Sequence, residues 1–341
     1  MNVTDYLQTW AASYKEDFVN NIMPFWMRYG LDHKNGGVYT CLDRDGRLMD
    51  TTKSVWFQGR FGFIAAYAYN QIEQNPDWLA ASRSCIDFME KHCFDKDGRM
   101  FFEVTEEGLP LRKRRYVFSE CFAAIAMSEY ALASGDRTYA EKALDLFKRI
   151  LRNLATPGLL EPKYLPTLQA RGHSITMILI NTASRIRAAI SDPILDTQIN
   201  ESIAAIRRYF MHPEFKALLE MVGPDGELID TCNGRIINPG HCIETAWFIL
   251  EEAKHRHWDK DLVQMGIRIL EWSWEWGWDK EYGGIINFRD CRNFPVQDYS
   301  QDMKFWWPQT EAIIATLYAY QATCDEKYLD MHRQISDWTY A

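Results

Sequence analysis

The chain has 341 residues, of which 47% are hydrophobic and 25% are charged, proportions that are typical of a soluble globular protein. Its formal net charge of −9 argues against a nucleic-acid-binding protein, because such proteins need clustered cations. The sequence has no apolar run long enough for a membrane span and no apolar core of a signal peptide, and its eight Cys form no C-x-x-C pair. We therefore expect a cytoplasmic protein with reduced thiols and no metal site, which binds neither nucleic acid nor membranes.

Helical periodicity dominates the chain. Apolar residues recur at i, i+3, i+4 and i+7, the spacing of an amphipathic helix. No linker rich in Pro, Gly or Ser divides the sequence, so we predict an all-α protein with a single domain over residues 1–341. The predicted helices are 6–28, 58–73, 78–92, 119–133, 139–154, 175–190, 195–210, 241–255, 259–276 and 308–322.

Turn signals lie between these helices, and two of them resemble each other. Residues 32–39 and 279–286 both begin with Asp and continue through a Gly-Gly pair to a β-branched residue. Such turns favour short β-hairpins between helices, and helix pairs that recur every ~50 to 60 residues predict a repeat architecture. An (α/α)6 barrel has this pattern, and an open helical solenoid is the alternative. The long connections 100–116 and 221–238 favour the barrel, because loops that build a pocket are long.

One predicted helix start carries a histidine and a glutamate close together. Asn238 is a good N-cap and Pro239 suits the first helical position, which places His241 in the first turn and Glu244 three residues later. The electropositive helix N-terminus favours a neutral His241 imidazole, which can accept a proton. An ordinary capped helix with a structural histidine is the alternative.

Other charged residues also lie near predicted helix starts. Arg60 lies on an otherwise apolar or small-residue helix, so we expect it to point inward, toward a ligand or an internal salt bridge. Pro308 marks a helix start and places Glu311 in the first turn, which repeats the arrangement of Glu244; the ordinary preference of acids for helix N-termini explains both equally well. His173 either caps a helix or lines the same rim, and the remaining six histidines are expected on the surface.

Long motifs, in order from about residue 25 to 320, resemble those of the N-acylglucosamine 2-epimerase family. They include the Gly-Gly turns, the segment that ends in Arg60, the helix start with His241, and the segment before Glu311. The matching segments are 25–27, 36–47, 53–60, 238–241 with Glu244 and Trp247, 278–279, 283–284, and 303–308 with Glu311.

This resemblance implies a homodimer of (α/α)6 barrels that interconverts N-acetylglucosamine and N-acetylmannosamine by inversion at C2. Arg60, His241 and Glu311 correspond to residues that the family needs for activity, and Glu244 matches a carboxylate beside the histidine. The implied roles are acid/base for His241, oxyanion stabilisation for Arg60, and sugar positioning or ring opening for Glu244 and Glu311. Neither NAD nor a metal is implied, and ATP is implied at most as an allosteric activator, since the chain has no Walker-type loop.

The chain departs from the family pattern in two places. The sequence stops before a family segment with a His-x-Pro-Arg core, whose histidine is the partner of the one matched by His241. Met177 stands where the cellobiose 2-epimerase branch has a histidine, which favours an N-acyl monosaccharide as substrate. The substrate-binding residues expected from the resemblance are Trp56, His173, Met177, Lys304 and Trp307.

Rival functions remain open at this point. An aldose–ketose isomerase, or a cellobiose or mannose 2-epimerase, would use the same barrel. A glycosidase would use paired carboxylates. A non-catalytic member would bind a sugar or another protein without reaction.

Overall fold

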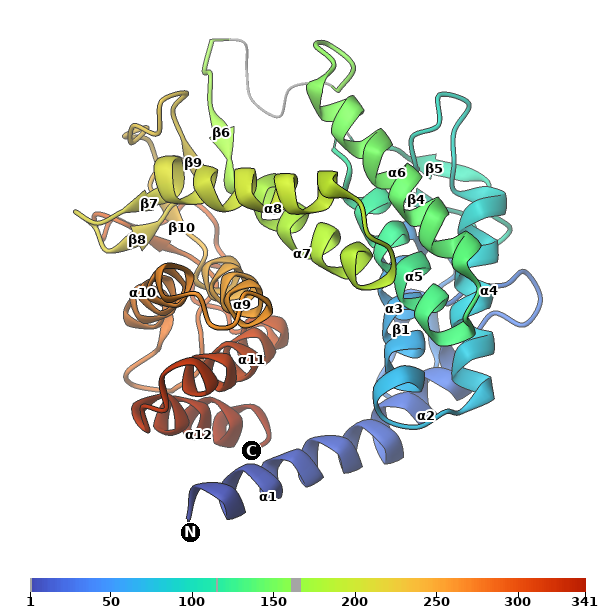
Figure 1. Cartoon of the computed structure of the whole chain (residues 1–341), viewed down its shortest axis with the longest axis horizontal. Helices are drawn as coiled ribbons and strands as arrows, with labels where there is room; N and C mark the ends of the chain where they lie inside the picture. Colours follow the sequence, from blue (N-terminus) through green and yellow to red (C-terminus); the bar gives the residue numbers. More distant parts are fainter. Residues whose placement is uncertain (1, 115, 161–166) are drawn as a thin grey trace. The chain divides into compact units, whose positions relative to one another are not determined.

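The computed structural model describes residues 2–114, 116–160 and 167–341, and this part of the chain is mainly helical (Figure 1). Its backbone contacts divide the chain into two compact units. The first unit is Met1–Lys163 with Arg185–Leu195, and the second is Tyr164–Ser184 with Asp196–Ala341. The single domain predicted over residues 1–341 stays a prediction.

The helices of the first unit begin and end within a few residues of the predicted positions. The exception is the predicted helix 6–28, which continues beyond its first α-helical part through wider π-helical turns. The elements are α1 (Val3–Asp17), η1 (Phe18–Ile22), α2 (Met23–Phe25), η2 (Trp26–Gly30), α3 (Val55–Gln71), α4 (Pro76–His92), α5 (Phe118–Ser134) and α6 (Arg137–Ala155).

Helix α5 is the central helix of the first unit. Nearly all its residues are buried, and α3, α4 and α6 pack against it, as Figure 1 shows for these neighbouring helices. Helix α3 approaches α5 closely because Gly59 has no side chain: a Cβ atom there would lie 2.6 Å from the backbone of Phe122. Small residues on α3 therefore set the distance between these two helices.

The second unit repeats the pattern of packed helices. Helix α9 packs against both α10 and α11, and α11 packs against α12. Helices α7 and α8 begin in one unit and end in the other. The elements are α7 (His173–Ala189), α8 (Pro193–Ala205), η3 (Ile206–Phe210), α9 (Pro239–His255), α10 (Lys260–Gly277), α11 (Trp306–Thr323) and α12 (Lys327–Thr339).

The strands are short and antiparallel, and they lie in the connections between helices, as the turn signals predict. They pair as β1 with β2, β3 with β4 and β4 with β5, β6 with β9, β7 with β8, and β10 with β11. Their bounds are β1 Cys41–Leu42, β2 Leu48–Asp50, β3 Lys53–Ser54, β4 Glu103–Val104, β5 Pro110–Arg112, β6 Arg171–Gly172, β7 Met211–His212, β8 Ala217–Leu218, β9 Met221–Val222, β10 Ile236–Ile237 and β11 Arg289–Asp290.

The turn at residues 32–39, named here the first Asp-Gly-Gly turn, is held by a buried lysine and a buried glutamine. Lys53 Nζ lies 2.6 Å from Asp32 Oδ2, and both side chains are at most 1% exposed. Gln58, on α3, uses its amide as a two-way link to Val38: it accepts from the backbone N–H at 2.9 Å and donates to the carbonyl at 2.6 Å. Asp32, Lys53 and Gln58 are named here the first clamp.

The second Asp-Gly-Gly turn, at residues 279–286, is built in the same way. The likeness between the two turns that the sequence predicts is therefore confirmed. Lys304 Nζ lies 2.7 Å from Asp279 Oδ2. Gln309, on α11, accepts from the N–H of Ile285 at 2.7 Å and donates to its carbonyl at 2.8 Å. Asp279, Lys304 and Gln309 form the second clamp, whose ion pair is less buried than the first, with side chains 16% and 21% exposed.

Two histidines expected on the surface are buried instead. His212 and His332 are 7% and 0% exposed. Burial lowers the pKa of His332 to about 4, and the neighbouring positive charge of Arg333 acts in the same direction. His332 lies on the buried side of α12 with Leu329 and Ile335, and His212 lies in the two-residue strand β7, whose pairing with β8 the sequence does not reveal.

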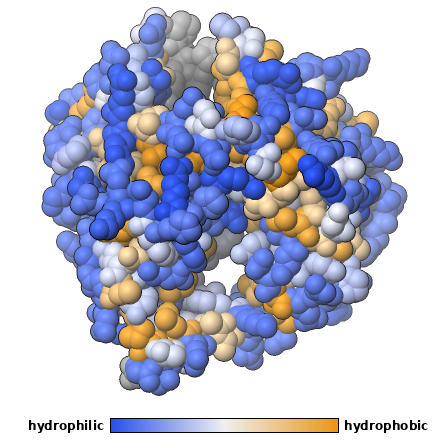
Figure 2. All heavy atoms as spheres, viewed as in Figure 1, coloured by the Kyte–Doolittle hydropathy of each residue, from blue (hydrophilic) through white to orange (hydrophobic). Residues whose placement is uncertain are grey.

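On the face shown in Figure 2, hydrophobic residues form separate groups among hydrophilic ones. Within the described ranges, no helix has the length and hydrophobicity needed to cross a membrane.

Candidate active site

The predicted helix start at His241 is confirmed. The His241 N–H donates to the side chain of Asn238 at 3.1 Å, and Pro239 occupies the first helical position. His241, Glu244 and Trp247 are partly exposed, whereas the residues between them are buried. The 3.6-residue helical period therefore brings these three side chains out on one side of α9.

Trp307 lies beside His241. The two ring centroids are 5.4 Å apart and the rings are inclined by 39°. Gly240 makes this approach possible, because a Cβ atom at that position would lie 2.5 Å from the Trp307 ring. The aromatic wall beside the histidine thus depends on a glycine in the first turn of α9.

Glu311 also faces α9. Trp247 Nε1–H donates to Glu311 Oε2 at 2.6 Å, and the Trp247 ring stacks at 9° on Tyr318, with centroids 6.1 Å apart. We expected Glu311 in the first turn of its helix, but this prediction is wrong, because α11 begins at Trp306. Proline has no N–H to lose within the first turn, so Pro308 is tolerated as the third residue of the helix and does not mark its start.

The carboxylate that contacts the His241 ring is that of Glu220, a residue that the sequence analysis missed. Glu220 Oε1 lies 3.1 Å from His241 Nδ1. Glu220 precedes β9, and its N–H bonds to the Ile236 carbonyl, next to the start of α9. A sequence signal does exist: Glu220 is the one charged residue in the apolar run 217–222.

Glu220 changes the electrostatics expected at His241. Burial alone would raise the pKa of the Glu220 carboxyl, but the positive charges of His241 and His173 and the hydrogen bond from His241 hold it well below its usual range. The expectation of a neutral His241 considered only the helix N-terminus. The ionised carboxylate acts in the opposite direction, because it attracts a proton to the imidazole.

His173 lies behind this pair and is fully buried. Its Nδ1 is 3.7 Å from the same Glu220 oxygen, and its Nε2 is 3.1 Å from the hydroxyl of Thr245 on α9. Met177, one turn later on α7, is 3% exposed. Of the two, the structure joins His173 to the surroundings of His241, and the role of Met177 in substrate binding stays a prediction.

The remaining predicted site residues are held by other partners. Arg60, in the first unit, is exposed and not buried as expected; its guanidinium lies 4.4 Å from the centre of the Phe122 ring. Arg60 follows Trp56 by one turn, on the opposite side of α3 from the buried Gln58 and Gly59, which explains the error. Trp56 stacks on Phe118 with centroids 5.3 Å apart. Lys304 belongs to the second clamp.

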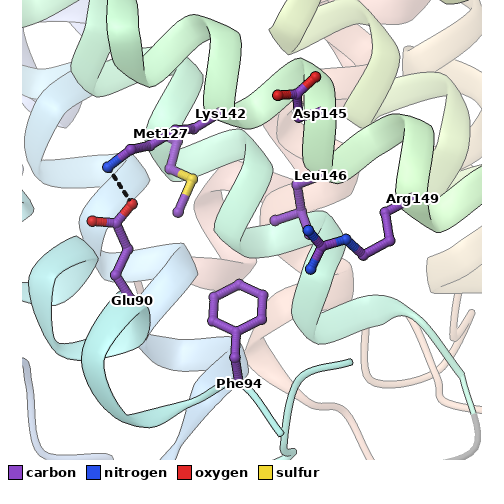
Figure 3. Close-up of a pocket in the computed structure, with 7 residues that line it drawn as sticks. All are labelled: Glu90, Phe94, Met127, Lys142, Asp145, Leu146 and Arg149. Carbon is purple, nitrogen blue, oxygen red and sulfur yellow. Dashed lines mark hydrogen bonds and ion pairs between the residues drawn. The ribbon is translucent and has the colours of Figure 1, made fainter. Parts of the chain in front are cut away.

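A separate hollow in the first unit contains none of these residues. It measures about 430 Å³ and lies against helices α4, α5 and α6 (Figure 3). Three of its four charged side chains have described partners: Lys142 pairs with Glu90 at 2.6 Å, and Arg149 donates to the Gly98 carbonyl at 3.0 Å. We assign no function to this hollow.

Comparisons with known proteins show which family the chain belongs to. The sequence profile of the N-acylglucosamine 2-epimerase (GlcNAc 2-epimerase) family matches residues 37–340. The chain belongs to the N-acylglucosamine 2-epimerase family. It is 30% identical to the N-acylglucosamine 2-epimerase of Bos taurus, over 94% of this chain and 78% of the bovine one. It is 24% identical to the cellobiose 2-epimerase of Ruminococcus albus, over 94% of this chain and 84% of the relative.

Solved structures confirm the fold of this family member. The cellobiose 2-epimerase from Bacillus thermoamylovorans B4167 superposes with a TM-score of 0.85 at 20% identity, over 98% of this chain and 87% of that one. Proteins of this group have the (α/α)6 barrel fold, so the predicted all-α fold class is correct. The relatives also establish the general class of activity: this family member is a carbohydrate epimerase, an isomerase.

Proposed function

We propose that this protein interconverts N-acetylglucosamine and N-acetylmannosamine by removing and returning the proton at C2. The likeness to a named N-acylglucosamine 2-epimerase, at 30% identity over 94% of the chain, carries this proposal. The cellobiose 2-epimerase relative is less similar, at 24% identity. The N-acetyl sugar is therefore the substrate to test first.

The residues around His241 suit this chemistry. C2 of the open-chain sugar lies next to the aldehyde, which makes its proton acidic, and removal of that proton places negative charge on O1. His241 is the acid/base at C2, and the ring of Trp307, 5.4 Å away, offers an apolar face to the sugar. Glu311 and Glu244 would position the sugar or assist ring opening. Arg60 would stabilise the negative charge on O1.

The decisive experiment follows N-acetylmannosamine by proton NMR in deuterated water. Deuterium at C2 together with the appearance of N-acetylglucosamine is the expected result. A keto sugar as product would replace the proposal with an aldose–ketose isomerase, and faster turnover of cellobiose or mannose would replace it with the other epimerase. Sugar binding without exchange at C2 would replace it with the non-catalytic reading.

A matched pair of variants ties the result to His241. His241→Asn is expected to abolish exchange, since it removes the acid/base. His255→Asn is the control, because His255 is an exposed residue in the last turn of the same helix. Equal loss of exchange in both variants would count against His241 as the base.

Three finer properties belong to the same proposal. We expect a homodimer, which light scattering would detect as twice the mass of one chain. We expect ATP to act at most as an activator, which the exchange assay with and without ATP would reveal. A cytoplasmic location is supported by the cysteines of the described residues, which form no disulfide and of which five are buried.

A further inference from the structure

His241 and three residues around it form a closed ring of contacts. His241 Nδ1 contacts Glu220 at 3.1 Å, and the same carboxylate oxygen lies 3.7 Å from His173 Nδ1. His173 Nε2 contacts Thr245 Oγ1 at 3.1 Å, and the Thr245 hydroxyl donates to the His241 carbonyl at 2.8 Å. The side chain and the backbone of His241 are therefore held by the same group of residues.

The direction of each hydrogen bond follows from the donors available. An ionised carboxylate only accepts, so the hydrogen bond from His241 to Glu220 requires a proton on Nδ1. The single Thr245 proton is given to the His241 carbonyl, so Oγ1 accepts from His173 Nε2–H. In neutral His241 the basic nitrogen is then Nε2, on the opposite side of the ring from Glu220.

One side-chain nitrogen of His173, Nδ1, faces the Glu220 carboxylate. Among the described residues, its buried Nδ1 has no hydrogen-bond partner, and the Glu220 oxygen is the anionic group within ion-pair distance. Its backbone also reaches the same carboxylate residue: the His173 N–H donates to the Glu220 carbonyl at 3.0 Å. His173 therefore holds the backbone of Glu220 by a hydrogen bond and lies within ion-pair distance of its carboxylate, and the Glu220 side chain is only 20% exposed.

The other ionisable group near Glu220 does not compete for the proton. Cys242, on α9, donates its thiol proton to the Leu218 carbonyl at 3.3 Å. Burial, and secondarily the charge of Glu220, raise the pKa of Cys242 well above its usual range, so it stays neutral. The charged or titratable groups that face Glu220 in the described contacts are His241 from α9 and His173 from α7.

We propose that Glu220 is a positioning residue for the reaction: held by His173, it fixes His241 in the Nδ1–H tautomer, so that Nε2 exchanges the proton with C2, and it stabilises the imidazolium formed in that step. The carboxylate acts through His241 and does not touch the sugar. The kinetic part of this inference rests on the proposed epimerase function, but the tautomer part does not.

The tautomer is tested by NMR of the histidine side chains in the full chain, labelled with ¹⁵N. In the unmodified protein, we expect neutral His241 to carry its proton on Nδ1. Glu220→Gln keeps an acceptor but removes the charge, so the titration midpoint of His241 should fall by about one pH unit or more. Glu220→Asp keeps the charge and should restore most of the midpoint.

The kinetic test uses the exchange at C2. Glu220→Gln should lower kcat ~10- to 100-fold and change KM by less than about threefold, because the variant loses acid/base efficiency and not sugar contacts. The acid limb of the pH–rate profile should move with the His241 midpoint. Glu214→Gln is the matched control: Glu214 contacts His212 Nδ1 at 2.9 Å in the same unit, in a pair that contains no proposed site residue.

The outcomes separate the two proposals. If the unmodified protein shows no exchange at C2, the proposed function fails, while the NMR titration still decides the role of Glu220. An unchanged titration midpoint of His241 in Glu220→Gln, or an unmodified protein whose neutral His241 carries its proton on Nε2, would overturn the positioning role. So would a Glu220→Gln variant whose kcat stays within about twofold of the control.

Discussion

Replacing the buried lysine of the first clamp by methionine should destabilise the protein far more than the same change in the second clamp. Lys53 Nζ donates to Asp32 and to the carbonyls of Gly36 and Glu106, at 2.6, 2.8 and 3.0 Å. Lys53→Met fills similar volume but leaves the Asp32 carboxylate and two carbonyls without this donor. Breaking a fully buried pair from one side costs ~3–5 kcal/mol.

Lys304→Met is the internal control. The Lys304–Asp279 pair has nearly the same length, 2.7 Å, but its side chains are 16% and 21% exposed, so water can replace the lost partner. Partly exposed pairs contribute ~1 kcal/mol or less. The pKa values of Asp32 and Asp279 are both lowered to about 2, so proton linkage alone predicts no difference. The expected difference of at least ~2 kcal/mol comes from charge left in dry surroundings.

Urea unfolding followed by far-UV circular dichroism measures both variants, with Lys53→Met/Asp32→Asn as a third. The double variant has no stranded charge and should be more stable than Lys53→Met alone. Two results would refute the reasoning. One is equal loss of unfolding free energy in the Lys53 and Lys304 variants, and the other is a double variant no more stable than Lys53→Met.

Three further predictions concern acid stability, the aromatic wall and the second clamp. Burial alone would raise the pKa of Asp32, but its hydrogen bonds lower it from 3.8 to about 2. The ~2 kcal/mol of stability that this shift contributes is complete above about pH 4 and is lost as the pH falls through 2. Acid titration of Asp32→Asn, followed by circular dichroism, should lack this step. Gly240→Ala should push the Trp307 ring away from His241, which should lower kcat ~10-fold in the exchange assay and change Tm only slightly in calorimetry. Unchanged tryptophan fluorescence and kcat would contradict this prediction. Gln309→Ala leaves a buried N–H and carbonyl unpaired and should cost ~2–4 kcal/mol in urea unfolding, and a loss under 1 kcal/mol would count against the clamp.

The sequence predicted those features that local physical rules determine. The helix start at His241 depends on Asn238 and Pro239, which are neighbours in the chain, and the repeat of the Gly-Gly turns depends on residues whose backbone angles few other residues adopt. Both were therefore visible without the structure. The family motifs added the candidates on distant helices, which spacing alone would not have brought together.

The missed or misplaced residues depend on tertiary packing. Glu220 reaches His241 because its N–H bonds to the Ile236 carbonyl near the start of α9, and His173 reaches Glu220 because β6 pairs with β9. Such pairings between residues far apart in the chain have no periodic sequence signal. Arg60 was expected to point inward because its neighbours are small or apolar. Several of those small residues, such as Gly59, allow α3 to approach α5 closely. Their presence therefore does not indicate whether the side of the helix that carries Arg60 is buried.

The two clamps also place opposite charges at the same position relative to their lysines. Arg60 follows the lysine of the first clamp by seven residues, and Glu311 follows the lysine of the second clamp by the same number. Each clamp binds its turn through a side-chain ion pair and through backbone atoms, and neither uses the residue at this seventh position. The same clamp can therefore be followed by a cation at one turn and by an anion at the other without any change in the contacts that hold the turn.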